Sequence, residues 1–429
     1  WRIRCKGPEA SAAGSSQRSG ATRGGAGAHG TVRSQSRLSE SEEAMPTRSL
    51  VTPYFEVHSL QLGHLGPGEF ARWRDLELRA LEPNPNLSPN FVIPVLRHLD
   101  SQGDIVLQVV RRPLRLGGEW MAVVPLRQVA ADRFLPVPHY KVELSKHAFL
   151  SGLLVDASQA QSVLELIYLD WQKHSTPGVV METCRSDGPT FRLLRQLAQQ
   201  QGLLCLEVDG FDRAGMVPTE MGEADLQRRL PSRAKKRRSH LKKLSALAEV
   251  SFRWWMGREI DDGVIERFLA LENMGWKGEN GSSLLSRPNE AAFFREMIRS
   301  FAAQEQAWFV ELCLGDRVIA SSSNLRSGRG AAAFKIGYDP EFSAYAPGIN
   351  CELELMCAAP QRLSDVDDID SGTVASSYVE ELWPRRHRVA TVIFATSALG
   401  QVVLGAANGV RSIKRVLRER RTAQPTAVT

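Results

Sequence analysis

In the second half of the chain, a short stretch typical of a turn precedes a segment whose apolar residues recur at helical spacing. It reads Tyr345-Ala346-Pro347-Gly348, and the periodic segment continues through Ile349 and Asn350. A helix that begins here would present free backbone N–H groups and its positive dipole end, which suit a diphosphate group. Gly348 would let the backbone approach such a ligand without an intervening Cβ. We therefore expect Pro347, Gly348, Ile349 and Asn350 to bind an anion, with a simple turn and helix cap as the alternative.

Three side chains that can move protons flank this segment. Asp339 and Asp370 are candidate general bases, and Tyr338 is the candidate acid. Each aspartate also has a structural interpretation, because Asp residues close turns through their own backbone hydrogen bonds. Asp339 would then cap the turn at Tyr338-Asp339-Pro340, and Asp370 would stabilise the turn at Ser371-Gly372.

Two lysines and a tryptophan are candidates for holding charged or ring-shaped ligand groups. Lys335 or Lys277 could neutralise a phosphate or a carboxylate. Lys335 alternates with Phe334 and Ile336 on an expected strand, so it could equally face solvent. Trp276 is either a substrate platform or a packed aromatic side chain. The close pair Cys351 and Cys357 has no His or Asp spaced to activate it and is expected in the core.

The elements that would position these residues form an antiparallel meander followed by a helix. Short turns at Gly315-Asp316 and Ser327–Gly330 separate its strands. The expected strands are 307–314, 317–325 and 331–337. Ile349, Leu353, Met356 and Cys357 line one face of the helix, and Pro360 is expected to stop it.

Strand and helix patterns alternate along the rest of the chain, which favours an α/β (α+β) architecture. Expected strands cover 54–62, 104–111, 119–126, 149–155, 178–182, 203–208 and 250–255, and expected helices 69–80, 88–98, 158–172, 190–201, 232–247, 260–273 and 289–304. Ser232 is the expected N-cap of the basic helix, residues 275–281 are an expected loop, and a polar strand at Asp370 precedes a helix near Tyr378–Leu382.

Composition indicates a globular protein with an uneven charge. The 429 residues suggest two to three domains, and 43% hydrophobic with 24% charged residues argues against a wholly disordered or fibrous chain. The net charge of +6 is concentrated in residues 1–44, 228–243 and 411–421, so the remainder carries −11. A nucleic-acid-binding surface over the whole molecule is therefore not expected. Six Cys without CxxC and nine His without HExxH give neither a disulfide framework nor a metal site.

The two ends raise questions of processing and membrane association. Residues 1–44 are rich in Gly, Ser and Ala and are expected to be a flexible tail, with translation starting at Met45. The uncharged run 389–410 has about the length of a membrane span. Its three Gly and several polar residues favour instead a buried strand at Val389–Ala395, a turn and an amphipathic helix. A cytoplasmic location is the expectation, with membrane association as the alternative.

Several short motifs resemble one known family. They are Phe268-Leu269-Ala270-Leu271-Glu272 followed by Gly275-Trp276-Lys277-Gly278, then Phe334-Lys335-Ile336-Gly337-Tyr338-Asp339, Tyr345-Ala346-Pro347-Gly348, and Asp370-Ser371-Gly372 with Trp383. Their order is similar to that of CelD-type acetyltransferases, named from cellulose biosynthesis and related to the FemAB aminoacyltransferases. The resemblance extends from about Tyr54 to Leu417 and is strongest in 232–384.

This resemblance implies tandem GNAT-like domains with mixed, mainly antiparallel sheets flanked by helices. The implied domains are 45–225 and 250–396, joined by a basic helix at 226–249 and followed by a helix and tail at 397–429. It also implies an acyltransferase with acyl-coenzyme A as co-substrate, no metal, and an amine-bearing small molecule or saccharide as acceptor, in envelope or exopolysaccharide biosynthesis. Trp276, Lys277 and Trp383 would contact that acceptor.

Two other functions remain open. The fuller Gln/Arg-x-x-Gly-x-Gly/Ala signature of acetyltransferases is replaced here by a degenerate form, and FemAB relatives use aminoacyl-tRNA as the donor. A scaffold without catalysis, with a vestigial cofactor cleft, is the third hypothesis. In the first half, Asp187 before the helix at Pro189 would repel a diphosphate, so that half is expected to be a scaffold or an acceptor-side wall.

The basic helix itself admits three interpretations. It could be a solvated face or strut between domains, an electrostatic guide for the phosphates of coenzyme A, or a contact for tRNA or an anionic membrane.

Overall fold

The structure, a computed structural model, describes residues 54–174 and 176–409. The expected flexible tail at 1–44, the expected start at Met45 and the basic residues 411–421 lie outside these ranges. The described residues belong to one compact unit, Thr47–Thr429.

The first half of the described chain contains a strand, two helices, three strands, a helix, a strand, a helix and a long final strand. These elements, with the short extra strand β5, are β1 (Glu56–Leu60), α1 (Pro67–Leu78), α2 (Pro89–His98), β2 (Val106–Arg111), β3 (Trp120–Val129), β4 (His139–Val142), β5 (Leu154–Val155), α3 (Ala160–Lys173), β6 (Gly178–Arg185), α4 (Pro189–Gln200) and β7 (Cys205–Met216).

The second half repeats this order after two linking helices. Its elements are α5 (Glu223–Arg229), α6 (Pro231–Ser245), β8 (Val250–Met256), α7 (Asp262–Asn273), α8 (Trp276–Glu279), α9 (Pro288–Ala303), β9 (Ala307–Leu314), β10 (Arg317–Ser327), β11 (Gly330–Tyr338), α10 (Pro347–Arg362), β12 (Asp368–Asp370), α11 (Val379–Leu382) and β13 (Arg385–Ala395). Residues 398–409 are also helical. The order starts again at β8, which begins at the predicted boundary of residue 250, whereas residue 225 lies within α5. The division into two domains remains a prediction.

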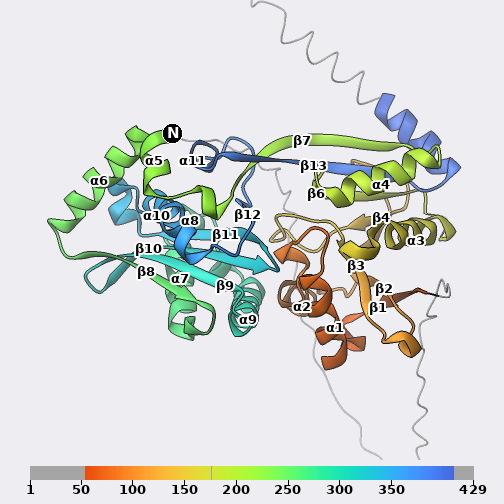
Figure 1. Cartoon of the computed structure of the whole chain (residues 1–429), viewed down its shortest axis with the longest axis horizontal. Coiled ribbons are helices and arrows are strands. Elements are labelled where there is room, and N and C mark those ends of the chain that lie inside the picture. The colour runs from red at the N-terminus through yellow and green to blue at the C-terminus, as the bar shows by residue number, and fades with distance from the viewer. Residues whose placement is uncertain (1–53, 175, 410–429) are drawn as a thin grey trace, which may run out of the picture. The chain divides into compact units, whose positions relative to one another are not determined.

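All the strands join in one open mixed sheet (Figure 1). Their order is β1-β2-β3-β4-β6-β13-β7-β12-β11-β10-β9-β8, with β5 on β3. Only the pairs β4·β6 and β11·β12 are parallel among the described strands. The final strand β13 lies between β6 and β7 of the first half, while β7 also pairs with β12 of the second half. The predicted α/β fold class with mixed, mainly antiparallel pairing is confirmed, and the two halves share a single sheet.

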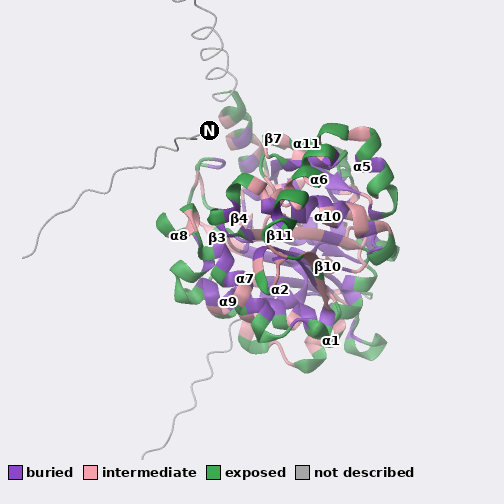
Figure 2. Cartoon of the chain, turned by 90° about the vertical axis from the view of Figure 1, so that its left-hand side faces the viewer, coloured by how far each residue is buried: buried purple, intermediate pink, exposed green. Residues whose placement is uncertain are grey.

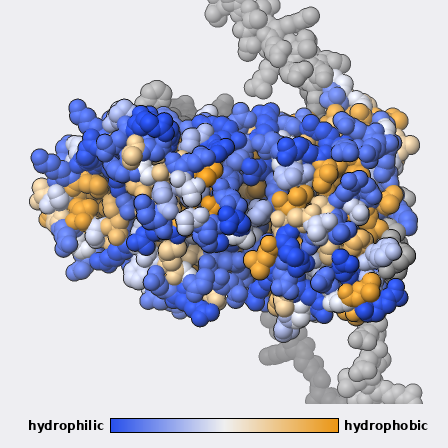
Figure 3. All heavy atoms as spheres, in the orientation of Figure 1, coloured by the Kyte–Doolittle hydropathy of each residue, from blue (hydrophilic) through white to orange (hydrophobic). Residues whose placement is uncertain are grey.

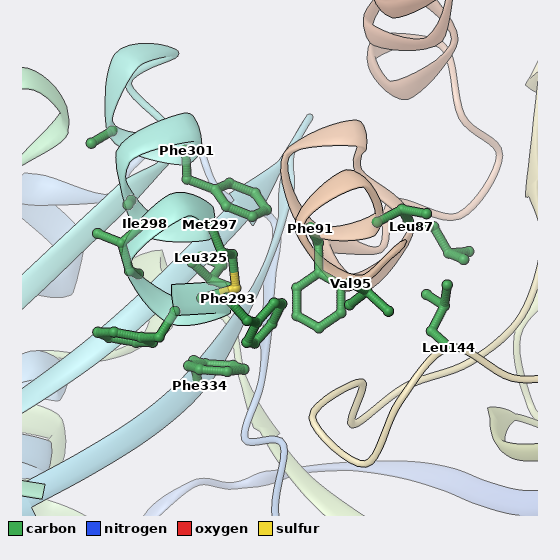
Figure 4. Close-up of a cluster of buried hydrophobic side chains, with 14 of the residues drawn as sticks. Leu87, Phe91, Val95, Leu144, Phe293, Met297, Ile298, Phe301, Leu325 and Phe334 are labelled. Carbon is green, nitrogen blue, oxygen red and sulfur yellow. The ribbon is translucent and has the colours of Figure 1, made fainter. Parts of the chain in front are cut away.

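The strands of this sheet consist mostly of buried residues, and the outward faces of the helices are exposed (Figure 2). On the second-half strands, Phe309 and Leu325 point to the face covered by α7 and α9, whereas Trp308 and Val310 point to the face covered by α10. One apolar cluster joins the halves, because α2 of the first half packs on α9 of the second (Figure 4). Phe91 and Phe293 meet edge to face there, with ring centroids 5.5 Å apart.

The predicted strand and helix boundaries are right where turn residues fix the backbone conformation. They are wrong where tertiary packing determines how far an element extends. The meander matches the predicted strands to within two residues, because Gly315 and Gly328 take positive φ at its turns. Ser232 is not the N-cap of the basic helix, which begins at Pro231, a residue that needs no N–H partner. Pro360 does not stop α10, which continues to Arg362. Other corrections are that 149–155 is strand only at its last two residues, that 275–281 contains α8, and that β7 runs eight residues beyond its predicted end.

The uncharged run near the C-terminus contributes a strand and a helix within the described residues. Val389–Ala395 lies inside β13, with buried side chains, and the helix at 398–409 follows a short turn. Among residues 54–174 and 176–409, no helix combines the length and apolarity needed to cross a membrane. The strand, turn and helix interpretation is therefore confirmed as far as residue 409.

The glycine of the Ile336-Gly337-Tyr338 motif is required by close helix packing. A Cβ at Gly337 would lie 2.6 Å from the backbone nitrogen of Glu272 on α7 and 2.8 Å from its Cα. We expect Gly337→Ala to destabilise the protein by about 1–3 kcal/mol through overpacking, measured by urea unfolding. Gly63→Ala, where no atom lies within 4 Å of the added carbon, is the control and should stay near wild type. Equal stability of the two variants would contradict this packing argument.

Candidate functional site

Two parallel strands of the second half pair briefly and then separate. The register joins Gly330 to Asp368 and Ala332 to Asp370, after which β11 continues to Tyr338 paired with β10 but not with β12. The chain leaves β12 through Gly372, which has φ +64° and approaches the Ala333 carbonyl so closely that a Cβ there would lie 2.7 Å from its oxygen. The edge of β11 that follows Ala332 on this side, unpaired with any described strand, is called the notch below.

The vertex of this notch is packed by a side chain from the first half. Phe149 stacks obliquely on Phe334 of β11, with ring centroids 5.4 Å apart, and a Cβ on Gly372 would lie 3.1 Å from the Phe149 ring. The vertex is thus closed by an aromatic pair from both halves, so a ligand would enter from the end of β11 that leads to α10.

The first turn of α10 lies at this open end and carries no side-chain cap. Its N-cap, Ala346, has left-handed backbone angles (φ 47°, ψ 54°), and Pro347 is the first helical residue. The Asn350 side chain donates to the Tyr345 carbonyl at 2.8 Å, so it braces the turn and is not directed at a ligand. The amides of Gly348 and Ile349 have no helical acceptor by virtue of their position. They are the groups that this turn can offer to an anion.

Gly348 sits directly against the end of β11. A Cβ at this position would lie 3.4 Å from Ile336 Cδ1 and 3.6 Å from Tyr338 Cδ1, and Tyr338 is 37% exposed. The candidate acid and the candidate anion-binding turn are therefore brought together.

The two candidate bases differ in what their carboxylates already bind. Asp339 caps the 3-10 turn at Pro340–Tyr345 by accepting the Glu341 amide at 3.0 Å, and it also pairs with Arg317. This geometry matches its structural alternative. Asp370 accepts the Gly372 amide at 2.7 Å through Oδ1, but its buried Oδ2 has no hydrogen-bond partner among the described residues.

A buried arginine holds Asp370 from the other side. Arg213 Nη1 lies 3.4 Å from Asp370 Oδ1 and donates to the Phe149 carbonyl at 2.7 Å, while its Nε donates to the Thr373 carbonyl at 2.8 Å. The Asp370 carboxylate is therefore fixed in orientation, with one oxygen left for another partner.

Asp370 lines a cavity of about 110 Å³ between the two halves of the sheet. Glu82 and Arg185 of the first half also line it, and Glu82 Oε1 likewise has no hydrogen-bond partner in the described structure. Burial raises the pKa of Glu82, against the opposing effect of Arg185. The cavity thus offers two hydrogen-bond acceptors to an incoming donor group.

Lys335 occupies a position that simple strand alternation does not predict. The register shifts so that Ser323 faces Lys335 and Asn324 faces Ala333, which makes Phe334 a bulge residue. Lys335 and Phe334 consequently lie on the same face, and Lys335 is half-buried with its Nζ 3.8 Å from Glu272 Oε1. Burial lowers the pKa of Lys335, with Lys277 and Lys146 adding to the effect. Its solvent-facing alternative is wrong, and it lies away from the α10 turn.

The remaining predicted substrate residues separate into exposed and buried positions. Trp276 is 60% exposed and borders a pocket of about 70 Å³ with Tyr338, so it is not a packed aromatic side chain. Lys277 donates to the Ile336 carbonyl at 2.8 Å and lies 3.5 Å from Glu272, and thereby ties α8 to β11. Trp383 is 1% exposed within the core under α10, which places it out of reach of a substrate.

The sequence predictions missed a buried glutamate on α10. Glu352 lies one turn after Gly348 on the same helical face, is 5% exposed, and has no hydrogen-bond partner for Oε2 among the described residues. Burial raises its pKa to about 7. On the strand face that α10 covers, Ser322 and Asn324 are also buried without side-chain partners in the described chain. The position of Glu352, four residues after Gly348 on the same helical face, was the feature of the sequence that could have identified it.

Tyr378 was also missed as a candidate proton donor. It is 39% exposed as a whole, yet its hydroxyl is desolvated enough to raise its pKa well above the usual value, with Glu352 and Tyr338 adding to the shift. Tyr338 and Tyr378 thus stand on the two arms of the notch.

Cysteine and metal chemistry find no support in the described residues. Burial raises the pKa of Cys351 well above its ordinary value and that of Cys357 to about 12. Cys351 lies in the core, as predicted, whereas Cys357 is only half-buried and contacts Arg237. Within residues 54–174 and 176–409, no three side chains of His, Cys, Asp or Glu gather as metal ligands.

The equivalent helix start in the first half is already occupied by a carboxylate. The Thr190 amide at the start of α4 donates to Glu82 Oε2 at 3.4 Å, and a Cβ on Gly188 would lie 2.3 Å from Glu82 Oε1. Asp187 accepts the Arg388 amide at 3.0 Å. This arrangement leaves few free backbone amides for a diphosphate at this helix start. It is consistent with the prediction that this half is a scaffold or an acceptor-side wall.

Comparison with known proteins identifies the class of the second half. Residues 231–381 match the family model of the acetyltransferase (GNAT) domain. A conserved protein of unknown function from Bacteroides thetaiotaomicron is 12% identical, with a TM-score of 0.50 over 77% of this chain and 98% of that chain. FemX is 11% identical, with a TM-score of 0.50 over 79% and 96%. A tandem GNAT protein from the clavulanic acid biosynthesis pathway is 13% identical, with a TM-score of 0.39 over 80% and 99%. None of the curated proteins matches the chain.

Residues 231–381 therefore match the acetyltransferase (GNAT) domain model, and the chain as a whole has a mixed α/β fold.

Proposed function

We propose that the protein moves an acyl group from acyl-coenzyme A to a primary amine. The observation that carries the proposal is the notch between β11 and β12, which leads to the uncapped first turn of α10. A thioester arm lying in the notch would place its diphosphate on the Gly348 and Ile349 amides, where the helix dipole favours negative charge. The matched GNAT family model supports the same donor class.

In this proposal the acceptor amine enters through the cavity between the halves. Its nitrogen attacks the thioester carbonyl, a C–N bond forms, and the C–S bond breaks. Asp370 accepts the proton that the amine loses, since its Oδ2 is free and its orientation is fixed. The departing thiolate takes its proton from water, because Tyr338 lies beside Gly348, at the end of the notch that would hold the diphosphate. Asp339 is left as a turn cap.

The acceptor class extends this proposal. The CelD-type resemblance favours an amine-bearing small molecule or saccharide, in envelope or exopolysaccharide biosynthesis. Trp276 would offer the acceptor an exposed ring beside Tyr338. Lys335 and Lys277 would act indirectly, by holding Glu272 and β11 in place.

The donor site is tested by calorimetry with acetyl-coenzyme A on a charged variant of the α10 turn. We expect Gly348→Asp to weaken binding at least 30-fold, because a carboxylate at this position competes with the diphosphate for the same amides. Because Gly348 is buried, the melting temperature of each variant is measured beside its binding, and binding is compared at a temperature where both variants are folded. Gly348→Ala, whose Cβ meets its neighbours at ordinary contact distance, is the matched control and should stay within about fivefold of wild type.

Unchanged binding by Gly348→Asp would refute this donor site. If the wild-type protein binds no acetyl-coenzyme A, the scaffold hypothesis or an aminoacyl-tRNA donor takes its place.

A further inference from the structure

The outward face of α6 carries five cations that have no acidic partner. Lys235, Lys236, Arg238, Lys242 and Lys243, the α6 basic face, are all exposed, and no ion pair joins any of them to the other described residues. The two arginines on the inner side of the same helix, by contrast, form ion pairs. Arg237 lies 3.1 Å from Glu223 and 2.5 Å from Glu354, and Arg233 pairs with Glu381. Local acids are therefore used by the inner arginines, and the outer face remains cationic.

This charge pattern disfavours the helix that carries it. Lys235 and Arg238 are spaced by three residues and Arg238 and Lys242 by four, so like charges are neighbours, each pair costing about 0.2–0.5 kcal/mol. The first turn has no acidic residue and no side-chain cap, although cations near a helix N-terminus oppose its dipole. An external anion would relieve this repulsion.

The α6 basic face borders the start of α10. Leu241 and Leu244 of α6 pack in one cluster with Phe342 and Tyr345 of the 3-10 turn that leads into α10. In Figure 2, α6 and α10 lie close together on the side that faces the viewer. The surface near α6, at the upper left of the space-filling view, is mostly hydrophilic (Figure 3). The inner side of α6 thus packs on the turn that leads to the α10 amides, and the α6 basic face lies on the outer side of the same helix.

The extent of the face fits a protein helix better than a nucleotide or a long RNA. Lys235 and Lys243 are eight residues apart, which is about 12 Å along a helix. A nucleotide at α10 would engage one end of this row. An extended RNA would meet the rest of the chain, which carries −11 outside the three basic segments.

We propose that the α6 basic face docks an acidic helix of a carrier protein whose phosphopantetheine arm delivers the acyl group into the notch. The arm ends in a phosphodiester, and the α10 amides would bind it as they would a diphosphate. The transfer is the one described above, with the carrier's free thiol as the second product. This inference rests on the proposed function, because it uses the same notch and the same α10 turn.

Binding of a labelled acyl carrier protein, loaded with an acetyl group on its phosphopantetheine, tests the inference by fluorescence anisotropy. The variant Lys236→Glu/Lys243→Glu should weaken carrier binding at least tenfold and acetyl-coenzyme A binding far less, because a nucleotide would engage only the Lys243 end of the face. The control Lys173→Glu/Arg192→Glu reverses two exposed cations of the first half and should change neither. Raising salt should weaken carrier binding to the wild-type protein more than to the reversed variant.

Three results would overturn the inference. One is no binding of the carrier protein while acetyl-coenzyme A binds normally. Another is an equal loss for both ligands in the Lys236→Glu/Lys243→Glu variant, which would assign the face to nucleotide phosphates. The third is binding of purified tRNA that depends on the same lysines, with no binding of the carrier. Failure of the proposed function is distinguishable, since acetyl-coenzyme A would then not bind or would ignore Gly348→Asp.

Discussion

Replacing Asp370 by Asn is expected to lower kcat by about 10²- to 10³-fold, the range that a general base contributes. The Asn side chain keeps an oxygen for the Gly372 amide but loses the free carboxylate oxygen of this cavity-lining residue. The assay follows release of coenzyme A thiol with acetyl-coenzyme A and the best acceptor from a panel of amino sugars and small diamines. The donor KM should change little, because Asp370 lies at the end of the notch opposite to α10.

A matched control separates this role from structural damage. Asp225 on α5 is also buried and ion-paired, with Arg228 and Arg229, and lies outside this cavity, so Asp225→Asn removes a comparable charge. We expect its kcat to stay within about threefold of wild type. Because Asp370 also holds buried Arg213, both variants should be compared by thermal unfolding. Similar kcat losses in the two variants, or a loss that tracks unfolding, would remove Asp370 from the mechanism.

The parts of the fold that could be predicted from the sequence are those fixed by neighbours in the chain. Turn glycines set the β9–β10–β11 meander, and Ser88 caps α2 by accepting the Asn90 amide as predicted. The position of β13 could not be predicted, because it pairs with strands about 200 residues away. The predicted end of β7 was early for a related reason. Its polar second half, including Arg213, reads as a loop until its β13 and β12 partners are known.

The candidate site shows the same division. The α10 turn and Tyr338 came together as predicted, since both lie on one continuous segment from β11 to α10. Lys335 was misplaced because a single bulge residue reverses the alternation. Trp383 was misplaced because its burial depends on packing under α10. Glu82 could not be predicted as a site residue, because it reaches the cavity from the first half of the chain.

Replacing Glu352 by Gln is expected to raise the free energy of unfolding at pH 8 and to lower kcat. Burial raises the pKa of Glu352 from 4.5 to about 7, so the folded state holds this proton more tightly than the unfolded state does. Stability is therefore lost as pH rises from about 4.5 to 7, by roughly 3 kcal/mol in total, and stays low above that range. Glutamine cannot ionise, so the stability difference between variant and wild type should grow by that amount across the same interval, measured by urea unfolding.

Glu77 is the control residue for the Glu352→Gln variant. Burial also raises its pKa to about 7, but Ser88 and Gln306 bond its carboxylate, which lies far from the notch. Glu77→Gln should show a similar pH-dependent stability gain with kcat near wild type, whereas Glu352→Gln should lose at least tenfold in kcat. An unpartnered carboxylate that costs stability beside Tyr378 and the α10 turn is best explained by use in the reaction. Full activity of Glu352→Gln would make Glu352 a passive buried group, and a flat stability difference would mean that it ionises normally.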